Sequence, residues 1–128
     1  MSGPFSYLIV ALGGGVGAAA RHGLGQLSAR AFGPGSPVGT MSANVLGGLL
    51  MGVLVGWLAR SGAGEGARLL LGVGLLGGFT TFSAFSLDAV QMIQRGQAGL
   101  AALYVGGSVV LSIAALALGL VLSRGSLA

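Results

Sequence analysis

Residues 77–86 read GGFTTFSAFS and lie inside a run without charge that extends from Leu69 to Leu87. Two glycines followed by two adjacent threonines are poor material for the middle of a helix, because glycine has a high entropic cost and threonine loses side-chain freedom. At membrane depth, non-helical backbone is tolerated only where it is buried in protein or lines a cavity. The stretch therefore predicts a broken membrane helix at a functional site, with Gly77 and Gly78 opening the helix.

The charge content of the whole chain also predicts a membrane protein. Of 128 residues, only 6% are charged, whereas a soluble domain carries about a quarter. A surface so poor in charge cannot stay dispersed in water, which excludes a soluble enzyme, a disordered linker and a nucleic-acid-binding module. The absence of cysteine excludes disulfide frameworks, thiolate catalysis and cysteine-ligated zinc.

The uncharged segments are long enough to cross a bilayer, which takes about 20 mainly apolar residues. Backbone polar groups in hydrocarbon must be satisfied within the segment, so these segments should be helices. The sequence predicts a single all-α transmembrane domain over residues 1–128, with four spans at about 5–26, 38–59, 68–94 and 99–122. Glycines recur every four residues in three of these spans, a spacing that lets membrane helices pack closely.

The six arginines are balanced across the two sides of the predicted membrane domain. With four spans, three arginines fall on each side: Arg60, Arg68 and Arg124 against Arg21, Arg30 and Arg95. Positive residues in loops normally set the orientation, and here they express no preference. A weaker orienting signal is one interpretation. The other is a protein that inserts both ways and forms an antiparallel, dual-topology homodimer, which the small size of the bundle favours.

Polar side chains recur at helical spacing in the second and fourth spans. Thr40 and Asn44 are four residues apart, and Tyr104, Ser108 and Ser112 repeat every four residues, so each set shares one helix face. For a single serine, a hydrogen bond within or between helices is the simpler explanation. Three hydroxyl residues in register also fit a track of hydrogen-bond donors.

Phe82 and Phe85 lie three residues apart on one face beside the predicted break. They are either a core pair or a source of ring edges, whose partial positive charge can face an anion. Neutral donors with aromatic edges suit a small anion that must be partly dehydrated without being trapped. Arg21 either snorkels to the interface or attracts anions into a vestibule. Asp88, the one acid near a span, leaves open an alternative, a small proton-coupled exporter of organic cations.

The sequence lacks the residues that catalysis or nucleotide binding would need. One histidine and two acids far apart in sequence cannot supply a catalytic metal site or a nucleophile with its base. Residues 13–18 fit G-x-G-x-x-A, but no acid follows about 20 residues later, as a dinucleotide site requires. We therefore expect no catalytic residues and no nucleotide or nucleic-acid partner.

Three motifs resemble the Fluc (CrcB-type) fluoride channel family. They are GAAAR at residues 17–21, GTMSANVLGG at 39–48 and GLLGGFTTFSAFS at 74–86. The last is highly specific, and the resemblance covers all four spans. Three positions depart from the family pattern: His22 replaces an aromatic residue, Ala84 a threonine and Asp88 a glutamate. None of these changes removes a residue that the resemblance assigns to the pore.

The resemblance implies a passive fluoride channel in the inner or plasma membrane of a prokaryote, which expels toxic fluoride. It implies an antiparallel homodimer with two pores. A structural Na⁺ at the dimer centre would be held by the backbone carbonyls of Gly77 and Thr80 from both subunits. The pore lining that it implies comprises Asn44, Phe82 and Phe85, the track Tyr104, Ser108 and Ser112, and Thr40 near one end.

Overall fold

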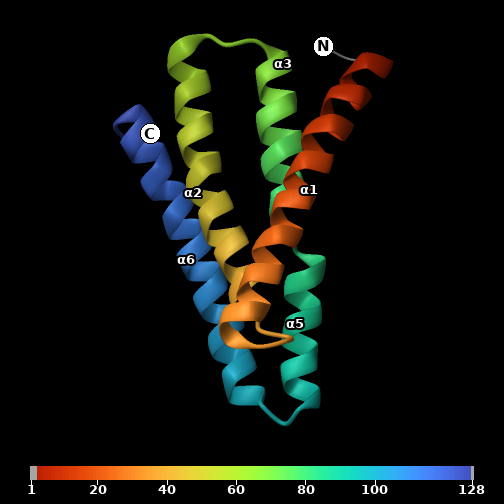
Figure 1. Ribbon diagram of the computed structural model, residues 1–128. Helices are drawn as coiled ribbons and strands as arrows, with labels where there is room; N and C mark the ends of the chain where they lie inside the picture. Colours follow the sequence, from red (N-terminus) through yellow and green to blue (C-terminus); the bar gives the residue numbers. More distant parts are fainter. Residues whose placement is uncertain (1–2, 128) are drawn as a thin grey trace.

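The computed structural model describes residues 3–127, all of whose regular structure is helical. The chain folds into four long helical runs that alternate in direction, and both ends of the described chain lie at the same end of the bundle (Figure 1). The third run is divided into four pieces. The elements are α1 (Pro4–Phe32), α2 (Val38–Ser61), α3 (Glu65–Ala67), η1 (Arg68–Leu76), α4 (Gly77–Phe79), α5 (Ser83–Gln94) and α6 (Ala98–Arg124).

Three of the runs are long and apolar enough to cross a membrane: Val38–Ser61, Glu65–Gln94 and Ala98–Arg124. The fourth, α1, has 29 residues and continues to Phe32, six residues beyond the end at residue 26 that the sequence predicts. Its second half contains Arg21 and Arg30, which lower its hydropathy. The all-helical membrane class is confirmed.

Close contact between α2 and α6 depends on the glycine spacing of α2. A Cβ added to Gly48 would lie 2.8 Å from the carbonyl oxygen of Ser112. At Gly52 an added Cβ would overlap the carbonyl oxygen of Leu116. These backbones touch because the glycines have no side chain, so the predicted packing role is confirmed.

A second glycine seam joins α1 to the third run. A Cβ on Gly13 would lie 3.0 Å from the amide nitrogen of Leu75. Cβ atoms on Gly17 and Gly78 would overlap the carbonyl oxygens of Leu75 and Gly14, respectively. Here the partner of α1 is partly η1, a nine-residue π-helix. This wider helix, whose hydrogen bonds run from i to i+5, is a feature that the sequence did not predict.

The break in the third run is present, but it lies three residues after the predicted position. Gly77 and Gly78 are helical and belong to α4. The backbone becomes extended at Thr80, with φ −87° and ψ 157°, and α5 begins at Ser83. The expectation that the two glycines open the helix is therefore wrong. Gly78 instead serves the close contact with Gly14, because its missing side chain lets the two backbones meet.

Candidate functional site

The two threonines at the break each stabilise one half of the interrupted helix. The amide and the hydroxyl of Thr80 both donate to the carbonyl of Leu76, at 3.0 Å, and close the first half. The hydroxyl of Thr81 accepts the amide of Ala84 at 3.1 Å. That contact satisfies one of the amides left free at the start of α5, as a capping side chain does.

Two side chains from neighbouring helices bind the backbone at the break. The carboxamide of Asn44 on α2 accepts the amide of Thr81 at 2.8 Å and donates to the carbonyl of Thr81 at 3.0 Å. On the α1 side, Nε of Arg21 donates to the carbonyl of Gly78 at 3.4 Å. Buried backbone groups need partners, and these side chains supply them where the helix does not.

Three carbonyls at the break remain without a hydrogen bond. Within residues 3–127, no donor reaches the carbonyl of Gly77, Phe79 or Thr80. The carbonyls of Leu76, Gly78 and Thr81 are all occupied. Two of these free backbone oxygens, those of Gly77 and Thr80, belong to the residues for which the resemblance implies a cation site.

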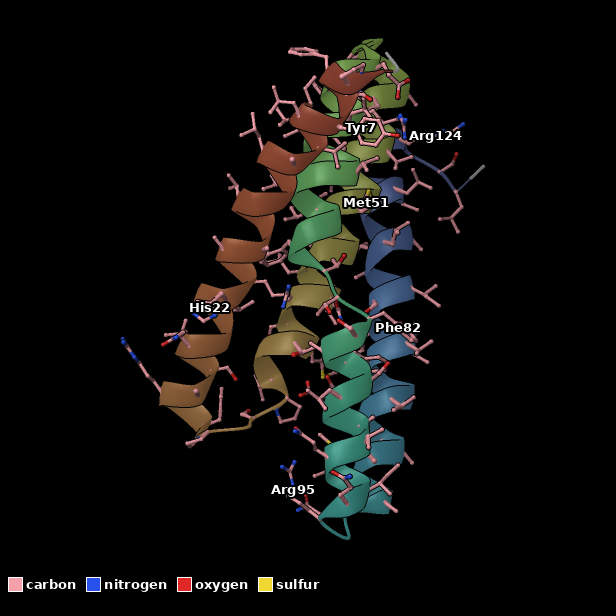
Figure 2. All side chains as sticks on the ribbon, turned by 90° about the vertical axis from the view of Figure 1, so that its right-hand side faces the viewer. Tyr7, His22, Met51, Phe82, Arg95 and Arg124 are labelled. Atoms are coloured by element: carbon pink, nitrogen blue, oxygen red, sulfur yellow. The ribbon has the colours of Figure 1, made fainter. Side chains whose placement is uncertain are left out.

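A cavity of about 620 Å³ opens beside the break, between α2, α5 and α6. Seven of the residues singled out from the sequence line it together: Asn44, Gly77, Thr80, Phe82, Phe85, Ser108 and Ser112. Apolar side chains such as Met51 and Leu116 form much of the remaining wall. Figure 2 shows Phe82 beside α6 at the start of α5. The tertiary structure thus brings residues from three helical runs to one cavity.

The two serines of this cavity have free hydroxyls. Ser108 is only 3% exposed, and neither its hydroxyl nor that of Ser112 has a hydrogen-bond partner in the described part of the chain. Neither serine bonds back to its own helix. A buried hydroxyl without a partner is costly, so both hydroxyls are available to donate to a ligand in the cavity.

The two phenylalanine rings differ in their surroundings. Their centroids are 5.6 Å apart and their planes are inclined by 60°. Phe85 is buried in a cluster with Met92, Ala101 and Tyr104, whereas Phe82 is 78% exposed in a single chain. Phe85 therefore has a packing role in addition to its place at the cavity, whereas Phe82 contacts Phe85 but is largely unburied within one chain.

Three residues singled out from the sequence lie outside this cavity. The hydroxyl of Tyr104 donates to Asp88 at 3.0 Å, and its ring centroid lies 5.2 Å from that of Phe85. Thr40 and Arg21 line a second hollow of about 400 Å³ with His22 and other residues. The sequence analysis did not predict the part played by Thr81. Its one signal is a threonine just ahead of a helix, where its hydroxyl can accept a backbone amide.

Comparison with known proteins identifies the family. A profile described as "CrcB-like protein, Camphor Resistance (CrcB)" matches residues 8–120. The chain belongs to the CrcB family. The resemblance drawn from the three sequence motifs is thereby confirmed.

Members of the CrcB family with high identity come from several bacteria. A protein of Novosphingobium aromaticivorans is 59% identical over 118 residues, 91% of this chain and 94% of its own length. A protein of Cereibacter sphaeroides is 58% identical over 123 residues, which cover 96% of this chain and 98% of that protein. A protein of Caulobacter vibrioides is 52% identical over 119 residues, which cover 91% of this chain and 94% of that protein. Each bears the name fluoride-specific ion channel FluC. The chain is thus a multi-pass membrane protein of an ion channel family and not an enzyme.

Proposed function

We propose that this chain is a fluoride-specific ion channel that exports fluoride passively and so relieves its toxicity. The observation that carries the proposal is the cavity beside the helix break, where the free hydroxyls of Ser108 and Ser112 and the ring of Phe82 lie together. Neutral donors replace the water that a small anion loses, without the trap that a fixed cation would form. The names of the relatives support the same function.

The proposed path uses the cavity and its two ends. Asn44, Phe82, Phe85, Ser108 and Ser112 line the fluoride pore. Tyr104 and Thr40 act near one end, where the hydroxyl of Tyr104 must leave Asp88 before it can donate to an anion. Arg21 attracts anions from the second hollow. The bond between Arg21 and Gly78 occupies one of its five N–H donors and leaves the others for this role.

We propose further that α1 is a fourth membrane crossing and that two copies pair antiparallel, each with its own pore. The balance of arginines supports dual topology, and Figure 2 shows Arg95 and Arg124 at opposite ends of the bundle. A single chain exposes many large apolar side chains, Phe82 among them. Phe82, exposed at the open side of the cavity, is suited to contact a second copy.

We propose that the carbonyls of Gly77 and Thr80 hold a structural Na⁺ shared by the two subunits. Their fit to the ion is supported by the absence of a hydrogen bond on either carbonyl oxygen, because unwound backbone carbonyls are typical Na⁺ ligands in membrane proteins. A bound Na⁺ would supply positive charge that offsets part of the cost of dehydrating a nearby anion. Gly77 and Thr80 both also line the cavity.

Fluoride efflux from liposomes tests the proposed function. Vesicles that contain the purified protein should release fluoride rapidly without a proton gradient, and should release chloride no faster than empty vesicles. Asp88→Asn should still conduct, because a passive path needs no proton carrier. Fluoride release no faster than that of empty vesicles, with the dimer folded, would reject the channel. Transport that requires both a proton gradient and Asp88 would favour the exporter.

Gly77→Val tests the shared Na⁺ site. Within one chain the substitution has room, because the nearest atom to an added Cβ is the carbonyl oxygen of Gly72 at 3.5 Å, an ordinary contact. We expect the variant to insert and fold but to lose dimer in size-exclusion chromatography, because the side chain crowds the site between subunits. The matched control is Gly15→Val, which meets open space. A normal Gly77→Val dimer would count against the assignment.

A further inference from the structure

Asn44 takes a backbone donor away from Gly77. In a continuous α-helix, the amide of residue i donates to the carbonyl of residue i−4, so the amide of Thr81 would bind the carbonyl of Gly77. In this protein that amide donates instead to Oδ1 of Asn44, at 2.8 Å. The side-chain oxygen of Asn44 thus replaces the Gly77 carbonyl as acceptor, and the Gly77 carbonyl is left free.

In the same way, the side chain of Thr81 takes a backbone donor away from the carbonyl of Thr80. In a continuous helix the amide of Ala84 would bind the carbonyl of Thr80. Here it donates to Oγ1 of Thr81 at 3.1 Å. The carbonyls of Gly77 and Thr80 therefore each lose their helical donor to a side-chain oxygen, whereas the carbonyl of Phe79, also without a hydrogen bond, does not. Each of these side-chain oxygens satisfies an amide that would otherwise be unpaired, which lowers the free-energy cost of interrupting the helix.

We propose that Asn44 and Thr81 are positioning residues for a cation, which keep the carbonyls of Gly77 and Thr80 available as ligands without touching the ion themselves. The inference rests on the proposed function, which places Na⁺ on these carbonyls. Asn44 also lines the fluoride cavity. Its one carboxamide therefore links the geometry of the cation site to that of the anion path.

The test is the Na⁺ dependence of thermal unfolding of the purified dimer in detergent, with N-methyl-D-glucamine keeping the ionic strength constant. Asn44→Leu and Thr81→Val preserve volume and remove the acceptor oxygens. Both should raise the half-saturating Na⁺ concentration by about 10- to 100-fold, the usual effect of losing a group that orients a metal ligand. Thr81→Ser keeps the acceptor oxygen and should retain a response close to that of the unmodified protein.

Ser108→Ala is the matched control, because Ser108 lines the same cavity but its hydroxyl has no partner in the described part of the chain. It should lower fluoride flux and leave the Na⁺ dependence unchanged. Unmodified protein without any Na⁺ response would reject the cation site itself. A normal response in Asn44→Leu and Thr81→Val would overturn only the positioning role. Failure of these two variants to form a dimer at every Na⁺ concentration would also overturn it, because excess ion rescues a merely weakened site.

Discussion

Gly17→Val should abolish the folded protein, whereas Gly15→Val, two residues away on the same helix, should leave it intact. A Cβ on Gly17 would overlap the carbonyl oxygen of Leu75 and lie 2.8 Å from the amide nitrogen of Phe79. Both are backbone atoms and cannot rotate away as a side chain can. The helices must separate, and the cost should exceed the 1–3 kcal/mol or so of ordinary overpacking.

Gly15 provides the control because no atom lies within 4 Å of its added Cβ. The change in helix propensity is the same in both variants, so a difference between them reports the contact with the third run. The measurement is the yield of monodisperse protein in size-exclusion chromatography, followed by thermal unfolding. Equal yields and equal unfolding temperatures would show that α1 does not pack as closely as the structure indicates.

Phe82→Ile should lower fluoride flux by about tenfold or more, equivalent to about 1.4 kcal/mol in the barrier. The aromatic ring offers edges with partial positive charge to an anion, and isoleucine offers none. Because Phe82 is 78% exposed within one chain, the substitution removes little packing inside the subunit. The fold of the subunit should therefore survive while conduction falls.

The measurement is fluoride efflux from liposomes with equal amounts of reconstituted dimer. Phe5→Ile is the matched control, since Phe5 is also exposed and lies at the start of α1, far along the chain from the break. It should conduct as the unmodified protein does. Flux that is unchanged in Phe82→Ile would mean that the ring serves packing between subunits and not the anion.

Local sequence properties were sufficient to predict much of the fold. Low charge and long apolar segments predict membrane helices because lipid excludes charge and unpaired backbone. The spacing of Gly48 and Gly52 predicts close packing because only the residue type matters for that contact. The run around Thr80 and Thr81 predicts a break, and the structure has one.

The position of the break was predictable only to within a few residues. Propensity pointed to Gly77 and Gly78, but both are helical, and Gly78 packs on the backbone of Gly14. The contact spans 64 residues of sequence, and no local property of Gly78 reveals it. The chain leaves the helix where Asn44, from another helix, can take over the amide and the carbonyl of Thr81.

The sequence by itself determined that this protein is a helical membrane protein of the CrcB family, and it predicted a set of neutral donors for an anion. It also grouped Ser108 with Ser112, and Phe82 with Phe85, because spacing within one helix sets a common face. Only the tertiary structure decided which donors are free. Tyr104 binds Asp88, whereas Ser108 and Ser112 have no partner in the described residues. Hydrogen bonds between helices depend on distances of about 3 Å, which spacing along one helix cannot specify.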